Sequence, residues 1–140
     1  MQLFKKFPKL FSKKTHLKIA LQGWGYDFRD NLEVAFEAYG SYATDLFTLQ
    51  AEKVVSEHNS SQPLFLYMAH LAVHSANFYS PLQAPLESIR KFAYIQDPQR
   101  RRFAAMLDKL DQSVGRLISA LQQKQMLHNS IILFTTDNGG

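Results

Sequence analysis

The sequence predicts an α/β fold in which a mostly parallel sheet is flanked by helices. Two short and almost entirely apolar runs, 64–69 and 131–136, are typical of strands that are covered on both faces, as in parallel sheets. A helical pattern of apolar residues precedes each run, at about 45–57 and about 98–124. The long crossover between the two predicted strands implies a right-handed parallel unit. Because two buried strands make a poor sheet, we expect a truncated part of a larger α/β domain.

Length and composition are those of an ordinary globular domain. A chain of 140 residues can bury a hydrophobic core, and 46% hydrophobic with 20% charged residues is a usual balance. No apolar stretch reaches the ~18 residues of a membrane span, so no transmembrane segment is expected. Cysteine is absent, which excludes disulfides, thiolate metal sites and a cysteine nucleophile in this chain.

Charge is concentrated at the start of the chain. Residues 1–22 contain six lysines and no acidic residue, whereas residues 23–140 carry ten basic and twelve acidic residues. Such a basic segment can touch nucleic acid or anionic lipid, but a solvated chain end is the simpler interpretation, and we predict no nucleic-acid partner. Its recurring lysines leave no apolar core for a signal peptide. We therefore divide the chain into a basic segment, 1–22, and a domain, 23–140.

The first predicted helix begins with Thr44 or Asp45 as its cap and ends near Glu57, before the polar residues 58–63. One of its sides is apolar, formed by Leu46, Phe47, Ala51, Val54 and Val55. The first predicted strand, 64–69, follows. Residues 70–98 contain three of the five prolines and are expected to be irregular, and so long a loop is often functional.

The longest predicted element is a one-sided amphipathic helix from about Pro98 to Lys124. Its apolar stripe is interpreted as core and comprises Phe103, Met106, Leu107, Leu110, Val114, Leu117, Ile118 and Leu121. The last predicted strand begins near Ser130 and ends at Thr136, where Asp137 and Asn138 follow.

Asp137 and Asn138 are candidate metal ligands. Ligands bind at the carboxyl ends of strands in open α/β sheets, and adjacent carboxylate and amide oxygens suit Ca²⁺ or Mg²⁺. The alternative is an ordinary turn, because Asp, Asn and Gly also dominate turns.

His74 is the second candidate, because it lies in the loop after the first predicted strand. If the two strands are parallel, this loop opens on the same edge as Asp137. His74 is then a hydrogen-bond donor to an anionic substrate group or a general acid. A plain surface histidine remains the alternative for both His70 and His74.

Other patterns are weaker. Residues 100–102 are three arginines at a helix start, where a solvated face is favoured over an anion site. Asn59 begins an N-x-S glycosylation pattern, which often occurs by chance. No serine has a His–acid pattern around it, and no glycine-rich phosphate loop occurs.

Several ordered segments of the chain resemble type I sulfatases of the arylsulfatase B group. One of them is Thr136-Asp137-Asn138-Gly139-Gly140, and another surrounds His74. The segments that carry the resemblance are 25–30, 42–48, 63–75, 81–85, 108–115 and 134–140. The similarity covers about residues 23–140, as the middle portion of a catalytic domain, whereas residues 1–22 match nothing recognisable.

The resemblance implies an alkaline-phosphatase-like α/β fold and hydrolysis of sulfate esters such as sulfated glycans or aryl sulfates. In this family a cysteine becomes formylglycine, whose hydrate attacks sulfur, and a Ca²⁺ bound by three aspartates and an asparagine organises the sulfate. Asp137 and Asn138 match the second pair of Ca²⁺ ligands, and His74 matches the histidine that contacts the sulfate or the leaving-group oxygen. The resemblance also implies a lysosomal or secreted enzyme.

The chain departs from the family pattern in what it lacks. It has no cysteine that could become formylglycine, and the first pair of aspartates has no counterpart. We therefore expect this chain alone to be inactive, with catalysis belonging to the intact enzyme. A non-catalytic remnant that binds a partner is one alternative, and another phosphodiesterase of the alkaline phosphatase superfamily is a second.

Overall fold

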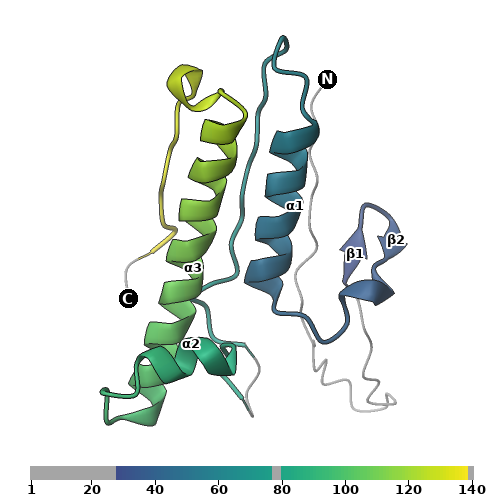
Figure 1. Cartoon of the computed structure of the whole chain (residues 1–140). Helices are drawn as coiled ribbons and strands as arrows, with labels where there is room; N and C mark the ends of the chain where they lie inside the picture. The colour runs from purple at the N-terminus through teal and green to yellow at the C-terminus, as the bar shows by residue number, and fades with distance from the viewer. Residues whose placement is uncertain (1–27, 77–79, 139–140) are drawn as a thin grey trace.

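The computed structural model describes residues 28–76 and 80–138. The predictions for the basic segment, 1–22, fall outside this part of the chain. The elements in order are β1 (Arg29–Asp30), β2 (Glu33–Val34), η1 (Phe36–Ala38), α1 (Ala43–Glu57), α2 (Leu86–Lys91), α3 (Pro98–Gln123) and η2 (Leu127–Asn129). Two long helices dominate the structure, and elongated loops run beside them (Figure 1).

A small hairpin precedes the first long helix. Strands β1 and β2 pair antiparallel, with Arg29 opposite Val34, and Asn31 in the turn has a φ of 57°. Asparagine tolerates this left-handed conformation better than most residues, which explains its place in the turn. Phe28 beside the hairpin stacks on Phe47 of α1, with ring centroids 5.9 Å apart. This contact joins the hairpin to the helical core.

Helix α1 confirms the first predicted helix, but its cap differs from the prediction. The residue before the helix is Tyr42, and no side chain caps it. Thr44 is buried inside the first turn, and Asp45 forms an ion pair with Lys109 of α3 at 2.6 Å. Asp45 therefore stabilises the packing of two helices rather than the start of one. The buried side of the helix includes Phe47, Ala51 and Val55, as predicted.

Helix α3 confirms the second predicted helix almost to the residue. Asp97 is the N-cap, and its side chain accepts a hydrogen bond from the backbone N–H of Arg100 at 2.7 Å. Pro98 occupies the first turn, where its missing N–H costs nothing. The predicted apolar stripe is only partly buried, because Met106 and Leu121 are covered while Phe103 and Leu107 are 42% and 49% exposed. Helix α3 therefore carries more apolar surface than the other described residues cover.

The two long helices run in the same direction and are joined by polar pairs along their length. Near the start of α1, Asp45 pairs with Lys109, and near its end the carbonyl of Ser56 accepts from Lys124 at 2.7 Å. At the centre the buried hydroxyls of Thr48 and Ser113 lie 2.6 Å apart. Because residue numbers rise together in both helices along these pairs, α1 and α3 are parallel (Figure 1).

The loop between the long helices was predicted to be irregular, but part of it is helical. It contains the six-residue helix α2, which packs on α3. Lys91 at the end of α2 bonds to Asp108 of α3 at 3.0 Å. The hydroxyl of Tyr42 donates to the carbonyl of Gln83 at 3.2 Å, which ties the loop to the start of α1.

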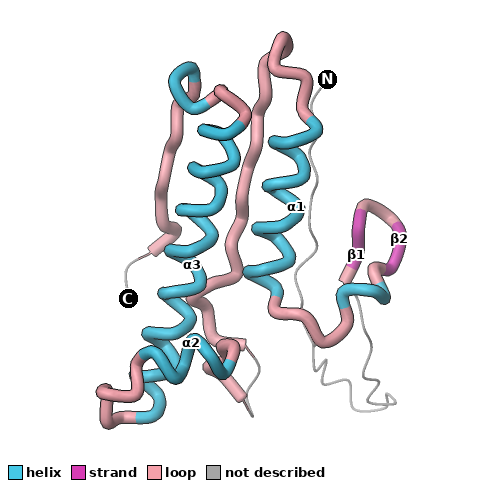
Figure 2. The backbone as a smooth tube through the Cα atoms, in the orientation of Figure 1, coloured by secondary structure: helices cyan, strands magenta, loops and turns pink. Residues whose placement is uncertain are grey.

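The parallel sheet of the predicted fold class does not form among the described residues. Segments 64–69 and 131–136 contain no strand, and Figure 2 shows both as loops. The two-stranded hairpin of β1 and β2 is the sheet that this part of the chain contains. A strand is defined by hydrogen bonds to a neighbouring strand, so an apolar run without such a neighbour stays a loop. The prediction of two strands was therefore wrong for this chain in isolation.

Candidate functional site

His74 lies in an exposed turn after the first apolar segment. Its backbone N–H donates to the carbonyl of Leu71 at 2.9 Å, which closes the turn. Its Nδ1 lies 2.7 Å from the carbonyl oxygen of Ser75. A carbonyl only accepts, so Nδ1 carries the proton of this bond and Nε2 is left for another partner. The local backbone therefore orients the ring with Nε2 available to a ligand.

His70 behaves differently from His74, although the sequence treats them alike. Its Nδ1 is buried and has no hydrogen-bond partner among the described residues. Burial lowers the pKa of His70 below its ordinary value, because the charged ring loses hydration. His70 therefore remains neutral at physiological pH and packs as part of the fold, which makes it the weaker of the two candidates.

Asp137 and Asn138 lie in an exposed bend that follows the second apolar segment. The hydroxyl of Thr136 donates to the backbone carbonyl of Asn138 at 2.7 Å and so shapes this bend. The described residues contain no group of three or more His, Cys, Asp or Glu side chains that could hold a metal ion. No hydrogen bond or ion pair of the described residues joins Asp137 to His74, so the two halves of the predicted site are not brought into contact in this part of the chain.

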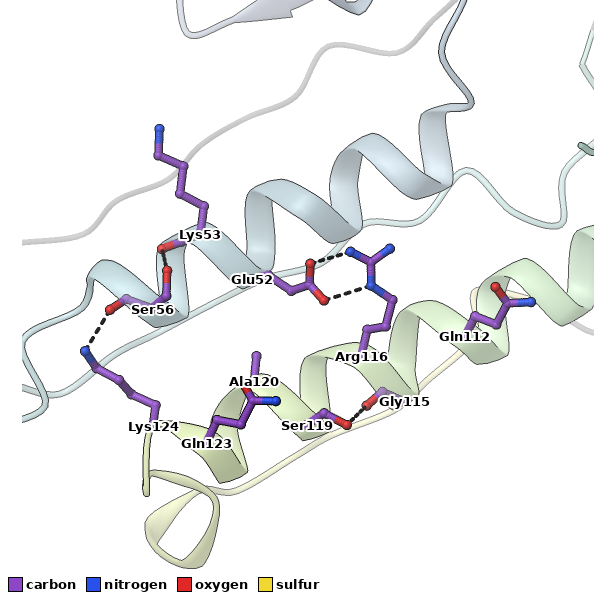
Figure 3. Close-up of a pocket in the computed structure, with 10 residues that line it drawn as sticks. All are labelled: Glu52, Lys53, Ser56, Gln112, Gly115, Arg116, Ser119, Ala120, Gln123 and Lys124. Carbon is purple, nitrogen blue, oxygen red and sulfur yellow. Dashed lines mark hydrogen bonds and ion pairs between the residues drawn. The ribbon is translucent and has the colours of Figure 1, made fainter.

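A hollow in the described structure lies away from these residues. It is an open groove of about 770 Å³ between α1 and α3 (Figure 3). Its polar lining includes Glu52, Arg116 and Lys124, and none of the predicted site residues borders it. Arg116 and Glu52 form a two-pronged ion pair, with Nε donating at 2.8 Å, and Lys124 donates to Ser56. These cations are engaged in helix packing, so the groove is a structural feature of the helix pair.

The weaker sequence patterns lie on the surface. Arg100 and Arg102 are exposed, while Arg101 turns inward and its Nε donates to the carbonyl of Ile95 at 2.8 Å. Asn59 is exposed in the turn after α1, and its side-chain oxygen accepts from the backbone N–H of Ser61 at 3.1 Å. No helix of the described residues is both long enough and apolar enough to cross a membrane.

Comparison with known proteins decides the family. The family model described as Sulfatase matches residues 5–140 of this chain. The chain belongs to the sulfatase family. The match starts within the basic segment, whose structure lies outside the described residues.

Curated relatives of this sulfatase chain carry several names. Arylsulfatase J of Mus musculus is 38% identical over 128 residues, which cover 90% of this chain and 21% of the relative. N-acetylgalactosamine-6-sulfatase of Mus musculus is 32% identical over 97 residues, 69% of this chain and 16% of the relative. The uncharacterized sulfatase YdeN of Escherichia coli K12 is 32% identical over 99 residues, which cover 70% of this chain and 17% of the relative. The chain thus spans about a fifth or less of the length of these relatives.

The residues present fit the sulfatase cofactors only in part. Asp137 and Asn138 can offer three side-chain oxygens to Ca²⁺, whereas the ion takes about six to eight. Formylglycine has no precursor here, because the sequence contains no cysteine. These two residues would therefore hold one side of a Ca²⁺ ion and would depend on other ligands for the rest of its shell.

Sequence reasoning did not foresee the role of Ser75 in orienting His74. The bond uses a backbone carbonyl, and any residue supplies one, so no side-chain pattern could have revealed it. The ion pairs of Asp45 and Glu52 with α3 were also missed. Asp45 and Glu52 are seven residues apart and therefore lie on the same side of α1, and this spacing was the signal available in the sequence.

Proposed function

We propose that this chain is the part of a sulfate ester hydrolase that supplies one side of its Ca²⁺ site and one substrate-contacting histidine. The observation that carries the proposal is the family match over residues 5–140, which includes both His74 and the pair Asp137–Asn138. Both lie in exposed bends after apolar segments, so both are accessible to a ligand. Sulfatase membership supports sulfate ester hydrolysis in general, and the arylsulfatase B-like character is the finer part of the proposal.

In this proposal Asp137 and Asn138 bind the cation that organises the sulfate. The Asp137 carboxylate adds negative charge at the ion, and the Asn138 amide adds a neutral oxygen that favours a hard cation. A bound Ca²⁺ would draw electron density from the sulfate oxygens and so favour attack at sulfur. The attacking group itself is not among the residues of this chain, because formylglycine cannot form here.

His74 has the geometry of a proton donor in this proposal. Its Nδ1–H is held by the Ser75 carbonyl, so a second proton on Nε2 would be presented to the ligand. A protonated Nε2 could donate to a sulfate oxygen or to the leaving-group oxygen as the S–O bond breaks. Donation to the leaving oxygen is general acid catalysis, which typically contributes about 10²–10⁴-fold in rate.

The substrate class and location are also part of the proposal. One relative is named for N-acetylgalactosamine-6-sulfate, which supports a sulfated glycan as the substrate of the intact enzyme. Others are named arylsulfatases, so a simple aryl sulfate is the practical assay substrate. We infer a lysosomal or secreted enzyme, and exposed Asn59 is then a candidate for glycosylation.

A domain graft tests the proposal. Mouse arylsulfatase J, with its matching 128-residue span replaced by the corresponding part of this chain, should hydrolyse 4-methylumbelliferyl sulfate in the presence of Ca²⁺. Asp137→Ala should abolish turnover because it removes a ligand, and His74→Ala should reduce kcat about 10²–10⁴-fold. His128→Gln, at an exposed histidine outside the site, is the matched control. A folded but inactive graft, or full activity in Asp137→Ala, would contradict the proposal.

The unmodified chain should show no turnover of the same substrate, even with Ca²⁺ and the formylglycine-generating enzyme present. The absence of cysteine is the specific observation that favours this result and, with it, the second candidate function: a non-catalytic sulfatase-derived binding module. Measurable hydrolysis by the purified chain would exclude that second candidate.

A further inference from the structure

Three arginines at the junction of α2 and α3 have side chains that no other described residue engages. Arg90 lies in the last turn of α2, and Arg100 and Arg102 lie near the start of α3, all of them exposed. The other seven Lys and Arg residues within 28–76 and 80–138 each form an ion pair or a hydrogen bond to a carbonyl. The sequence pattern alone favoured a solvated face, and the structure adds that the cations without a partner gather at one junction.

This junction is basic within a domain that is otherwise acidic. Residues 86–102 contain five Lys and Arg against two Asp and Glu, whereas the remainder of 23–140 contains five against ten. The two acids do not pair with the arginines. Asp97 caps the backbone N–H of Arg100, and no ion pair of the described residues uses Glu87. The junction therefore presents net positive charge to the solvent, which attracts polyanions.

Hydrogen bonds and packing hold this junction in a defined shape. Helix α2 packs on α3, and the Nε of Arg101 donates to the carbonyl of Ile95 at 2.8 Å, so Arg101 turns toward the connecting turn. Because successive helical residues are about 100° apart, Arg100 and Arg102 project on either side of Arg101. The exposed cations are thus carried by a preformed surface around the start of α3.

An exposed aromatic ring lies in the same connecting turn. Tyr94 is 73% exposed, and Phe92 lies beside it with ring centroids 6.2 Å apart. An exposed tyrosine offers an apolar ring face and a hydroxyl, which suit the C–H faces and hydroxyl groups of sugars. Arginine offers a planar fork of N–H donors that matches oxyanions. We call Arg90, Tyr94, Arg100 and Arg102 the basic corner.

The basic corner lies toward the same end of the structure as the candidate site residues. Segments 64–76 and 130–138 contain His74 and the Asp137–Asn138 pair. Both segments run along the long helices toward the end at which α3 begins (Figure 1). A chain-like ligand held at the corner is therefore on the side toward which both segments lead.

We propose that the basic corner is a secondary binding site for a sulfated glycan chain, separate from the residues that act on the sulfate ester. The arginines bind sulfate or carboxylate groups of the chain, and Tyr94 packs against a sugar ring. The choice of a glycan rests on the proposed function, whereas the free cations and the exposed ring are features of the structure. Such a site favours long, highly charged substrates over single sugars, because it adds contacts beyond the sulfate that is hydrolysed.

Binding of a defined glycan to the full 140-residue chain tests this site. The probe is a chondroitin 6-sulfate decasaccharide, titrated calorimetrically at physiological ionic strength with EDTA present. The chain should bind it at least about tenfold more tightly than the desulfated decasaccharide, which lacks the charge-assisted hydrogen bonds to sulfate. The affinity should fall as salt is added, because ions screen exposed charges.

Charge-matched variants locate the binding surface. Arg100→Gln/Arg102→Gln should weaken binding at least about tenfold, because two guanidinium contacts are lost. Lys13→Gln/Lys14→Gln removes the same charge from the basic segment, 1–22, and should change the affinity by less than about twofold. Urea unfolding should show the arginine variant to be as stable as the parent chain, because neither side chain has a partner to lose among the described residues.

Single substitutions test the other two members of the basic corner. Arg90→Gln and Tyr94→Ala should each weaken binding by about threefold or more, because one loses an ionic contact and the other a ring face. The controls are Lys53→Gln, at an exposed lysine of α1, and Leu32→Ala, at a hairpin side chain that is 85% exposed. Both controls should leave the affinity unchanged.

Three results would overturn the proposal. They are no binding of the sulfated decasaccharide, equal losses in the arginine and lysine double variants, and equally tight binding of single-stranded DNA or phosphatidylserine vesicles with the same dependence on Arg100 and Arg102. The binding assay needs neither Ca²⁺ nor turnover. An inactive graft alone would therefore contradict the proposed function, and absent binding alone would contradict the secondary site.

Discussion

At the scale of single residues, His70 and His74 show how position decides chemistry. They lie four residues apart in the sequence, yet one is half-buried with an unpaired Nδ1 and the other is exposed in a turn. Burial lowers the pKa of His70, whereas the Ser75 carbonyl fixes which nitrogen of His74 is available. The first packs within the fold in its neutral form, and the second is an exposed ring held by a neighbouring carbonyl.

The buried histidine makes stability depend on pH. Because the folded pKa of His70 lies below 6.5, the unfolded chain binds more protons, and the free energy of unfolding should fall as the pH drops below about 6.5. His70→Gln should remove this part of the pH dependence, measured by urea unfolding between pH 8 and pH 5. His128→Gln, at an exposed histidine, should keep it. An unchanged slope in His70→Gln would show that His70 is not the group responsible.

The hydroxyl pair at the helix interface is a second residue-scale test. Thr48 donates to the carbonyl of Thr44 at 2.7 Å, so the Ser113 hydroxyl is the donor across the 2.6 Å contact. Thr48→Val removes the acceptor and should lower the unfolding free energy by about 1–3 kcal/mol, because it leaves a buried hydroxyl without a partner.

Ser113→Ala should cost less than Thr48→Val, because Thr48 keeps its bond to Thr44. The double variant should be milder than the sum of the two, since no unpaired hydroxyl remains. Equal and additive losses in urea unfolding would argue that the contact is energetically neutral.

At the scale of elements, the long helices are determined mainly by their own sequences. Helix α3 begins where Asp97 caps it and Pro98 starts its first turn, and its apolar residues recur at helical spacing. Helix α1 instead lacks a side-chain cap and depends on contacts with α3 through Asp45 and Glu52. The two helices therefore differ in how much of their stability is local.

The cap of α3 gives the element-scale prediction. Asp97→Ala should lower the unfolding free energy by about 0.5–2 kcal/mol, because the N–H of Arg100 loses its acceptor. Asp97→Asn should restore most of the loss, since an amide oxygen also caps. Asp111→Ala, at an exposed mid-helix position, is the control and should change stability by no more than about 0.5 kcal/mol. A loss of equal size in both alanine variants would contradict a capping role.

At the scale of the whole molecule, burial is concentrated between the helices and is poor at the apolar segments. Val55 and Ala105 are fully buried, whereas residues 131–134 are exposed throughout. We expect native-state hydrogen exchange to be slowest in the centres of α1 and α3 and fastest from 131 to 138. Strong protection of 131–134 in the monomer would show that the isolated chain closes its own sheet.

How far the sequence alone predicts this protein depends on whether an element is local. Periodicity and capping residues predicted both long helices, and ordered motifs predicted the family. The cap of α1, helix α2 and the β1–β2 hairpin were missed or misplaced because tertiary contacts or two-residue strands decide them. The roles of His74 and the Asp137–Asn138 pair remain predictions, because their ligand-binding partners are not among the described residues.

Residue order alone is enough to predict the two long helices, the apolar segments and membership of the sulfatase family. Each of these features depends on residue order within a short stretch, so each can be predicted without knowledge of the tertiary structure. The fold was needed to show that α1 and α3 are parallel, that His70 is half-buried and His74 exposed, and that 64–69 and 131–136 form no sheet. A strand needs hydrogen bonds from a second segment, and no sequence pattern within one segment can supply them.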